Sequence, residues 1–64
     1  MNDDYLTVIE VAALLRLSAR RIRQMIGAGV FPGTIRTAEG PRGHLRIPRT
    51  AVNAYITARQ ENQG

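Results

Sequence analysis

Apolar positions near the start of the chain recur at the spacing of an α-helix. They would form one face of that helix, made of Val8, Val11, Ala12 and Leu15. Thr7, followed three residues later by Glu10, is the pattern of a capping box, in which each side chain accepts a backbone N–H of the other residue. The pattern predicts a first helix over residues 8–15, after a short lead-in that contains Tyr5 and Leu6.

A second helix is expected after a tight turn at residues 16–17. Ser18 is a favourable N-cap residue, and the helix is predicted to run over about residues 19–28. Its buried stripe would consist of Ala19, Ile22 and Ile26. Gly29 suits the left-handed position just after a helix. Two helices joined by so short a turn indicate a helix-turn-helix, with Ala12 as the small residue where the helices cross.

The periodicity then changes to that of β-strands. Residues 34–37 and 44–47 alternate polar and apolar side chains, and residues 38–43 between them are rich in turn formers. We therefore expect a β-hairpin with a projecting loop, which would be the wing beside the two helices. The side chains expected toward the core are Ile35, Leu45 and Ile47, and those expected on the other face are Arg36, His44 and Arg46.

A third helix is expected after Pro48, which suits a first helical turn. Its apolar stripe would consist of Ala51, Val52, Tyr55 and Ile56. The helix should end near Arg59, with residues 60–64 frayed. The aromatic residues expected in the core are Tyr5, Phe31 and Tyr55. The order of elements predicts an α+β, mostly α fold: one winged helix-turn-helix domain over residues 1–64, with three helices, a two-stranded wing and a core over about residues 5–59.

Length and composition exclude several classes of function. The 64 residues contain no cysteine and one histidine, so disulfides, thiolate zinc sites, multi-histidine metal sites and a cysteine nucleophile are not expected. The longest apolar run, residues 11–15, is far shorter than the roughly 20 residues of a membrane span. No pair of carboxylates shares a predicted face, as an enzyme site would require. We expect a non-enzymatic cytoplasmic protein with no cofactor, no metal and no membrane association.

Charge is concentrated in the middle of the chain. Nine arginines, no lysine and five acidic residues give a formal net charge of +4, and eight of the arginines but only one acid, Glu39, lie between Arg16 and Arg49. Such a basic segment is the electrostatic pattern of a nucleic-acid binder. The guanidinium group suits phosphate and guanine, although a GC-rich genome would favour arginine as well.

The predicted second helix places several polar residues on its outward face. With the apolar stripe turned inward, helical geometry puts Arg20, Arg21, Gln24 and Ala28 outward and Arg23 on the flank. Arginine pairs with guanine and glutamine with adenine in the major groove, and Ser18 can bind a phosphate as well as cap the helix. An ordinary solvated helix face is the competing interpretation. We favour DNA because the face belongs to the second helix of a helix-turn-helix and a basic wing follows.

The predicted wing adds further basic residues. Arg42 lies near its tip, and a ribbon of this kind can reach phosphates or enter a minor groove. The alternative for Arg36 and Arg46 is packing along the sheet with an acidic partner, and His44 is then a polar surface residue. Arg16, Arg49 and Arg59 are weaker candidates. The predicted DNA-binding residues are Ser18, Arg20, Arg21, Arg23, Gln24, Arg36, Arg42, His44 and Arg46.

Three segments resemble the excisionase family of DNA-binding domains, which belongs to the MerR-like winged helix group. They are Tyr5–Leu15 with Leu17 and Ser18, then Gly29–Pro32, and Arg42–Pro48. The resemblance covers about residues 5–56 and implies binding to double-stranded DNA, with the second helix in the major groove and the wing at the adjacent minor groove. Arg16 stands where many relatives have glycine, which predicts a strained or differently shaped turn. Pro41 in the wing loop is a second departure.

The resemblance also implies a biological role. Members of the family include phage recombination directionality factors, which bind repeated attachment-site sequences cooperatively and head to tail, bend the DNA and steer an integrase toward excision. The expected partners are therefore double-stranded DNA, an integrase and further copies of the chain, in the nucleoid or as a phage protein in the host cytoplasm. One alternative is a small MerR-like transcription regulator. Another is a protein-interaction module whose arginine face docks an acidic partner.

Overall fold

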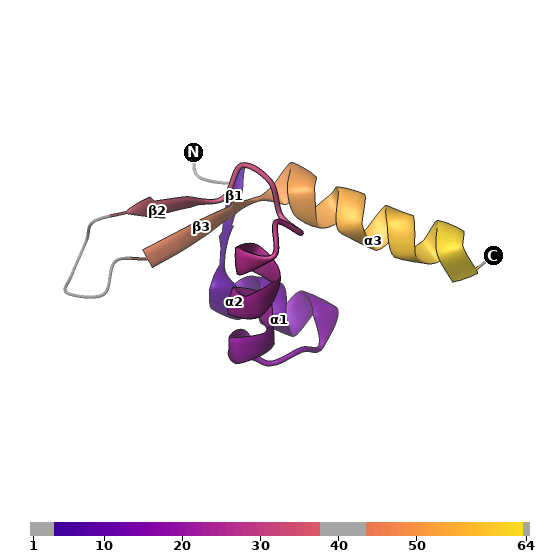
Figure 1. The fold of residues 1–64 in the computed structure, drawn as a ribbon, viewed down its shortest axis with the longest axis horizontal. Coiled ribbons are helices and arrows are strands. Elements are labelled where there is room, and N and C mark those ends of the chain that lie inside the picture. The colour runs from indigo at the N-terminus through magenta and orange to yellow at the C-terminus, as the bar shows by residue number, and fades with distance from the viewer. Residues whose placement is uncertain (1–3, 38–43, 64) are drawn as a thin grey trace.

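A computed structural model describes residues 4–37 and 44–63, with side chains through residue 60. The elements are β1 (Tyr5–Thr7), α1 (Val8–Leu15), α2 (Ala19–Gly27), β2 (Ile35–Thr37), β3 (His44–Pro48) and α3 (Arg49–Gln63). Figure 1 shows β3 running directly into α3, with the β2–β3 wing and the end of α3 pointing in opposite directions. Three helices, a small antiparallel sheet and the helix-turn-helix order confirm the predicted fold class.

The sheet contains one more strand than the sequence pattern predicts. Its order is β1-β3-β2, and both pairings are antiparallel. The lead-in forms β1, in which Leu6 pairs with Ile47 and both side chains are buried. A strand of three residues is too short to show a period of two. Only its contact with the distant β3 makes it a strand.

The local signals at the helix ends operate as predicted. The Thr7 N–H donates to Glu10 Oε1 at 2.9 Å, and the Glu10 N–H donates to Thr7 Oγ1 at 3.1 Å, so the capping box is complete. Ser18 Oγ accepts the Arg21 N–H at 3.0 Å at the start of α2. At the end of α2, Gly29 adopts a φ of 83°, which brings the Val30 N–H to the Met25 carbonyl at 3.0 Å. These contacts give the turn between the helices and the exit from α2 fixed geometries.

The core is shared by β1, β3, the three helices and the segment after α2. Its buried side chains include Val11, Ile22, Met25, Phe31, Ile47 and Val52. Ala12 is buried at the helix-turn-helix, as expected of a small residue at a helix crossing. In α2 the fully buried positions are Ile22 and Met25, while the predicted stripe residues Ala19 and Ile26 are only partly buried.

The aromatic residues divide between the core and the surface. Phe31 is buried and packs edge-on against the half-buried Tyr55, with ring centroids 5.5 Å apart. Tyr5 was expected in the core, but 40% of its surface is exposed. The alternation of β1 explains this correction, because Leu6 takes the inward position and its neighbour must point to the other face of the sheet.

The pairing register of the wing corrects one predicted orientation. Arg36 pairs with Leu45, and Ile35 pairs with Arg46. Directly paired residues share a face of the sheet, so Arg36 lies on the inner face with Leu45, and Ile35 lies on the outer face and is 47% exposed. The prediction had them the other way round. A register that differs by one residue moves every side chain of a strand to the opposite face.

The third helix is longer than predicted. It continues to Gln63 instead of ending near Arg59. No glycine or proline lies between residues 49 and 63, and the last residues are compatible with a helix. Among its described side chains, those that pack on the core lie in its first half: the buried Ala51 and Val52 and the half-buried Tyr55 and Ile56.

Candidate nucleic-acid interface

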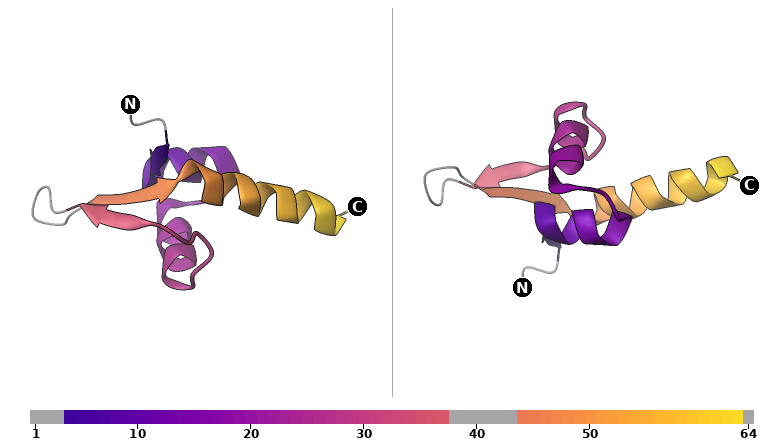
Figure 2. Two further views of the ribbon diagram at one scale, coloured as in Figure 1. Left: turned by 90° about the horizontal axis from the view of Figure 1, so that it is seen from above. Right: turned by 90° about the horizontal axis from the view of Figure 1, so that it is seen from below.

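The outward face of α2 carries a cluster of polar side chains. Its members are all exposed, and they are Arg20, Arg21, Arg23 and Gln24. Ile22 and Met25 fix this orientation, because both are buried against the core on the opposite side of the helix. Both views of Figure 2 show α2 on one side of the line formed by β3 and α3, with α1 on the other side. The α2 surface therefore faces away from α1 and is open to a large partner.

The arginines of this face are available to an incoming anion. Within the described part of the chain, the guanidinium groups of Arg20, Arg21 and Arg23 have no hydrogen-bond or ion-pair partner. An unpaired guanidinium keeps all of its N–H donors for a phosphate or for a guanine edge. The surface combines positive charge with arginine and glutamine, which are side-chain types that can pair with base edges in a major groove.

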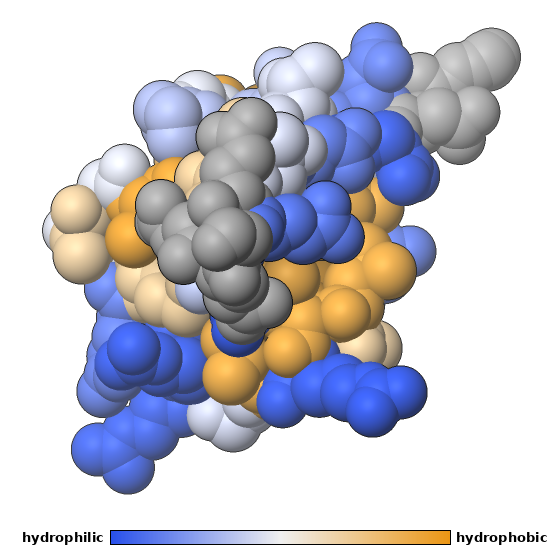
Figure 3. Space-filling view, turned by 90° about the vertical axis from the view of Figure 1, so that its right-hand side faces the viewer, coloured by the Kyte–Doolittle hydropathy of each residue, from blue (hydrophilic) through white to orange (hydrophobic). Residues whose placement is uncertain are grey.

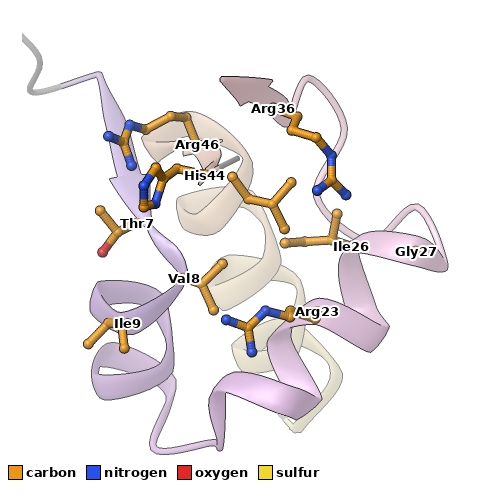
Figure 4. Close-up of a pocket in the computed structure, with 10 residues that line it drawn as sticks. Thr7, Val8, Ile9, Arg23, Ile26, Gly27, Arg36, His44 and Arg46 are labelled. Atoms are coloured by element: carbon orange, nitrogen blue, oxygen red, sulfur yellow. The ribbon is translucent and has the colours of Figure 1, made fainter. Parts of the chain in front are cut away.

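A groove separates α2 from the wing, and it has a volume of about 640 Å³. We call it the helix–wing groove, and its lining consists of Thr7, Val8, Ile9, Arg23, Ile26, Gly27, Arg36, His44, Leu45 and Arg46. Figure 4 shows Arg23 and Arg36 on the side of α2, and Arg46 and His44 on the side of Thr7. The basic residues of three different elements thus converge on one groove.

The chemistry of the helix–wing groove is that of a basic rim around an apolar floor. Val8, Ile26 and Leu45 supply the floor, and no carboxylate is among the lining residues. Arg36, on the inner face of the sheet, and Arg46, on its outer face, both line this groove. A nucleic-acid strand fits such a surface, since its phosphates would meet the guanidinium groups and its sugars would lie against the apolar floor.

The structure brings together some of the predicted residues and separates others. Arg23, Arg36, His44 and Arg46 share the helix–wing groove, while Arg20, Arg21 and Gln24 lie on the open face of α2. Ser18 is engaged as the α2 cap. Arg42 lies outside the described residues. The groove residues that the sequence did not indicate are Thr7, Ile9 and Gly27. Thr7 lies beside Arg46 through the pairing of β1 with β3, whereas Ile9 belongs to α1 and Gly27 to the end of α2.

The three weaker candidates lie away from this surface or have other contacts. Arg16 is in the turn after α1, with a φ of 59°. The Arg49 N–H donates to the Asp4 carbonyl at 2.7 Å. The Arg59 guanidinium lies 5.7 Å from the centre of the Tyr55 ring, on α3.

Two further properties concern the residues that the structure describes. Among them, no three histidine, cysteine or acidic side chains are grouped so that they could hold a metal ion. None of the helices in this part of the chain has the length and the apolar character needed to cross a membrane.

Comparison with known families identifies the domain. The model of a family described as a helix-turn-helix domain matches residues 5–60, from β1 into the second half of α3. Comparison with curated proteins and with solved structures gave no significant match. The matched segment contains the turn, α2 and the helix–wing groove, and domains of this family are generally non-enzymatic and bind specific sequences in double-stranded DNA. The chain therefore belongs to this family of helix-turn-helix DNA-binding domains.

Proposed function

We propose that this protein is an excisionase-type DNA-binding protein, which binds repeated sites, bends the DNA and directs an integrase toward excision. The observation that carries the proposal is the arrangement of two basic surfaces side by side: the exposed face of α2 and the helix–wing groove. In this proposal α2 enters the major groove. Arg20, Arg21 and Gln24 contact base edges there, and the wing follows the adjacent backbone.

The helix–wing groove would hold one strand of the duplex. Arg23 and Arg36 would bind phosphates from two sides, and Arg46 and His44 would extend the contact along β3. Arg42, Ser18 and the α2 residues complete the proposed DNA-binding set. Contacts of this kind fix the register of the protein on the duplex, whereas the α2 side chains select the sequence.

The size of the domain supports cooperative binding. A single small module covers roughly 600–1,000 Å² of protein surface on DNA, which gives modest affinity and specificity. Several copies bound head to tail on repeated sites would supply the missing affinity through a heterologous contact. An array of this kind also bends DNA, because each copy holds a short segment of the duplex at a fixed angle.

A gel-shift titration tests the proposed function. The protein is added to a duplex that spans the DNA next to its own gene, at two salt concentrations. A ladder of discrete bands is expected, and log K should fall against log salt with a slope of about −5 if about six phosphates are neutralised. A circular-permutation assay on the same duplex measures the bend. If an integrase gene adjoins this one, an excision assay with that integrase measures the effect on the direction of recombination.

The possible outcomes separate the alternatives. A single sharp shift without a ladder, and no effect on integrase, would favour a small transcription regulator. An absence of any shift at low salt would contradict DNA binding and favour an acidic protein partner at the arginine face. As a control, the variant Arg20→Gln/Arg21→Gln should lose the ladder, while Ile35→Thr, which changes an exposed outer-face residue of β2, should retain it.

A further inference from the structure

A second groove lies between the end of α1 and α3, and it has no lining residue in common with the helix–wing groove. Its volume is about 230 Å³, and we call it the α1–α3 groove; its lining consists of Leu14, Leu15, Arg16, Ile56, Arg59 and Gln60. Leu14 is 57% exposed, and Leu15 and Ile56 are half-buried. Figure 3 shows an apolar surface beside the end of α3, bordered above and below by hydrophilic side chains.

The position of this groove leaves it open when α2 is occupied. α1 and α2 lie on opposite sides of the line formed by β3 and α3 in both views of Figure 2. The α1–α3 groove is built from α1 and α3 alone, apart from the turn residue Arg16. A duplex bound to the outward face of α2 would therefore not cover it.

Arg16, at one border of the groove, has an unusual backbone conformation. Its φ of 59° lies in the left-handed region that favours glycine, and its backbone N–H caps α1 by donating to the Ala12 carbonyl and, at 3.3 Å, to the Ala13 carbonyl. A glycine would form the same turn without strain. The guanidinium has no hydrogen-bond or ion-pair partner among the described residues. A strained residue whose side chain is free points to a use for that side chain outside the fold.

Arg59 supplies a second positive charge on the other border. Its guanidinium lies 5.7 Å from the centre of the Tyr55 ring, and that ring in turn packs against Phe31. The contact limits the positions of the Arg59 side chain. The lining contains no carboxylate. No negative charge within the groove therefore balances the two arginines that flank its apolar floor.

We propose that the α1–α3 groove is a docking site for an acidic amphipathic helix of a partner protein. An apolar side chain of the partner would enter the floor beside Leu14 and Ile56, and carboxylates on either side of it would pair with Arg16 and Arg59. Charge complementarity selects this occupant. The duplex of the proposed function lies on the opposite side, at α2, so the two cations of this groove are left for another partner.

The carboxylates in the described part of the chain do not form the counterpart that this groove requires. The described part of the chain has two carboxylate side chains, Asp4 and Glu10, and Glu10 is engaged in the capping box of α1. The groove needs two carboxylates beside an apolar residue on one helical face. A partner of different sequence can supply that arrangement.

The test uses a fluorescein-labelled peptide designed as an amphipathic helix, with leucines on one face and glutamates along both borders of that face. Fluorescence anisotropy gives its affinity for the full chain, and NMR of the ¹⁵N-labelled chain maps where it binds. Shifts are expected at Leu14, Arg16, Ile56 and Gln60. The same peptide with lysine in place of glutamate should not bind.

Three variants make the experiment specific. Arg16→Gly should weaken peptide binding by roughly two- to fivefold, the range of an exposed ion pair, and it should fold normally because glycine suits the left-handed turn. Leu14→Gln should weaken it by roughly tenfold through lost apolar burial. Arg21→Gln, which removes a charge from α2, should leave peptide affinity unchanged, and Arg16→Gly should leave DNA affinity unchanged.

Several results would overturn the proposal. One is peptide-induced shifts that fall on α2 and the wing instead of the groove, since an acidic peptide would then only compete for the DNA surface. Another is an absence of binding by the glutamate peptide at millimolar concentration. Concentration-dependent shifts of the groove residues without any peptide would assign the groove to a second copy, and reduced DNA affinity of Arg16→Gly would assign Arg16 to DNA.

Discussion

Gly29 and Gly33 both have left-handed backbones, but their surroundings differ. A Cβ at Gly29 (φ 83°) would meet nothing within 4 Å, whereas a Cβ at Gly33 (φ 87°) would lie 3.1 Å from Pro48 Cγ. We expect Gly29→Ala to lower the free energy of unfolding by about 1–2 kcal/mol through backbone strain alone. Gly33→Ala should lower it further, because the Pro48 ring must also move. Urea denaturation measures both, and equal losses would contradict the steric contribution.

Individual residues were predictable where their role depends on close neighbours in sequence. The caps at Thr7 and Ser18 each involve a partner three residues away, and both were identified from the sequence. Gly29 was identified from its place just after a helix, where the chain often adopts the left-handed conformation that suits glycine. Arg16 was identified as a strained turn residue because it replaces an expected glycine, and its φ of 59° confirms this. Tyr5 was misplaced because its exposure depends on β3, which is distant in sequence.

We propose that α2 reads bases and that the helix–wing groove binds phosphates, and substitutions in each can distinguish these roles. Arg23→Gln/Arg36→Gln should weaken binding about equally for every DNA sequence and make the salt slope shallower by about 2, because two phosphate contacts are lost. Gln24→Ala should cost about 1–3 kcal/mol on the preferred sequence only and leave the slope unchanged. Gel shifts at several salt concentrations, on specific and unrelated duplexes, measure both effects.

A variant outside both DNA surfaces provides the control for this distinction. Arg59→Gln also removes one positive charge, but from α3, and we expect its affinity for DNA and its salt slope to match those of the unchanged protein. A sequence-dependent loss in the Arg23→Gln/Arg36→Gln variant would instead mean that these arginines read bases.

The three helices were predictable from the sequence, and the sheet was predictable only in part. Each helix carries an apolar stripe and local start signals, so its place follows from short-range pattern. β1 and the wing register depend on contacts between segments far apart in the chain, such as Leu6 with Ile47 and Arg36 with Leu45. The helix–wing groove was predictable only in part for the same reason, because it is built from segments far apart in the chain. Its arginines were identified as candidates, but the inward position of Arg36 required the register.

The two proposed binding surfaces lie on different sides of the domain, so both can be occupied at the same time. The α2 face and the helix–wing groove are basic and open, and the α1–α3 groove lies on the side of α1. The core between them supports both surfaces, since the central residues Ile22, Ile47 and Val52 belong to α2, β3 and α3. A change in that core should therefore affect both surfaces together.

Ile22→Ala tests this dependence. Ile22 is fully buried, and its truncation should lower the free energy of unfolding by about 2–5 kcal/mol. A domain of 64 residues has a small core, so a large part of the variant should be unfolded near 37 °C. Circular dichroism is expected to show a lower melting temperature, and gel shifts and fluorescence anisotropy are expected to show weaker apparent binding of both DNA and peptide. Weaker binding of only one of them would mean that the two surfaces do not share the core.

DNA should restore the folded state, because a duplex that binds only the native chain adds to its stability. At a free duplex concentration about 100-fold above Kd the gain is about 2.7 kcal/mol, which for a domain of this size corresponds to a rise in melting temperature of roughly 10–20 °C. We expect this rise for the unchanged protein and for Ile22→Ala, and a smaller one at high salt, because the phosphate contacts weaken. Thermal melts with specific duplex, unrelated duplex and no DNA measure it. A melting temperature that no duplex changes at low salt would contradict coupling between the fold and DNA binding.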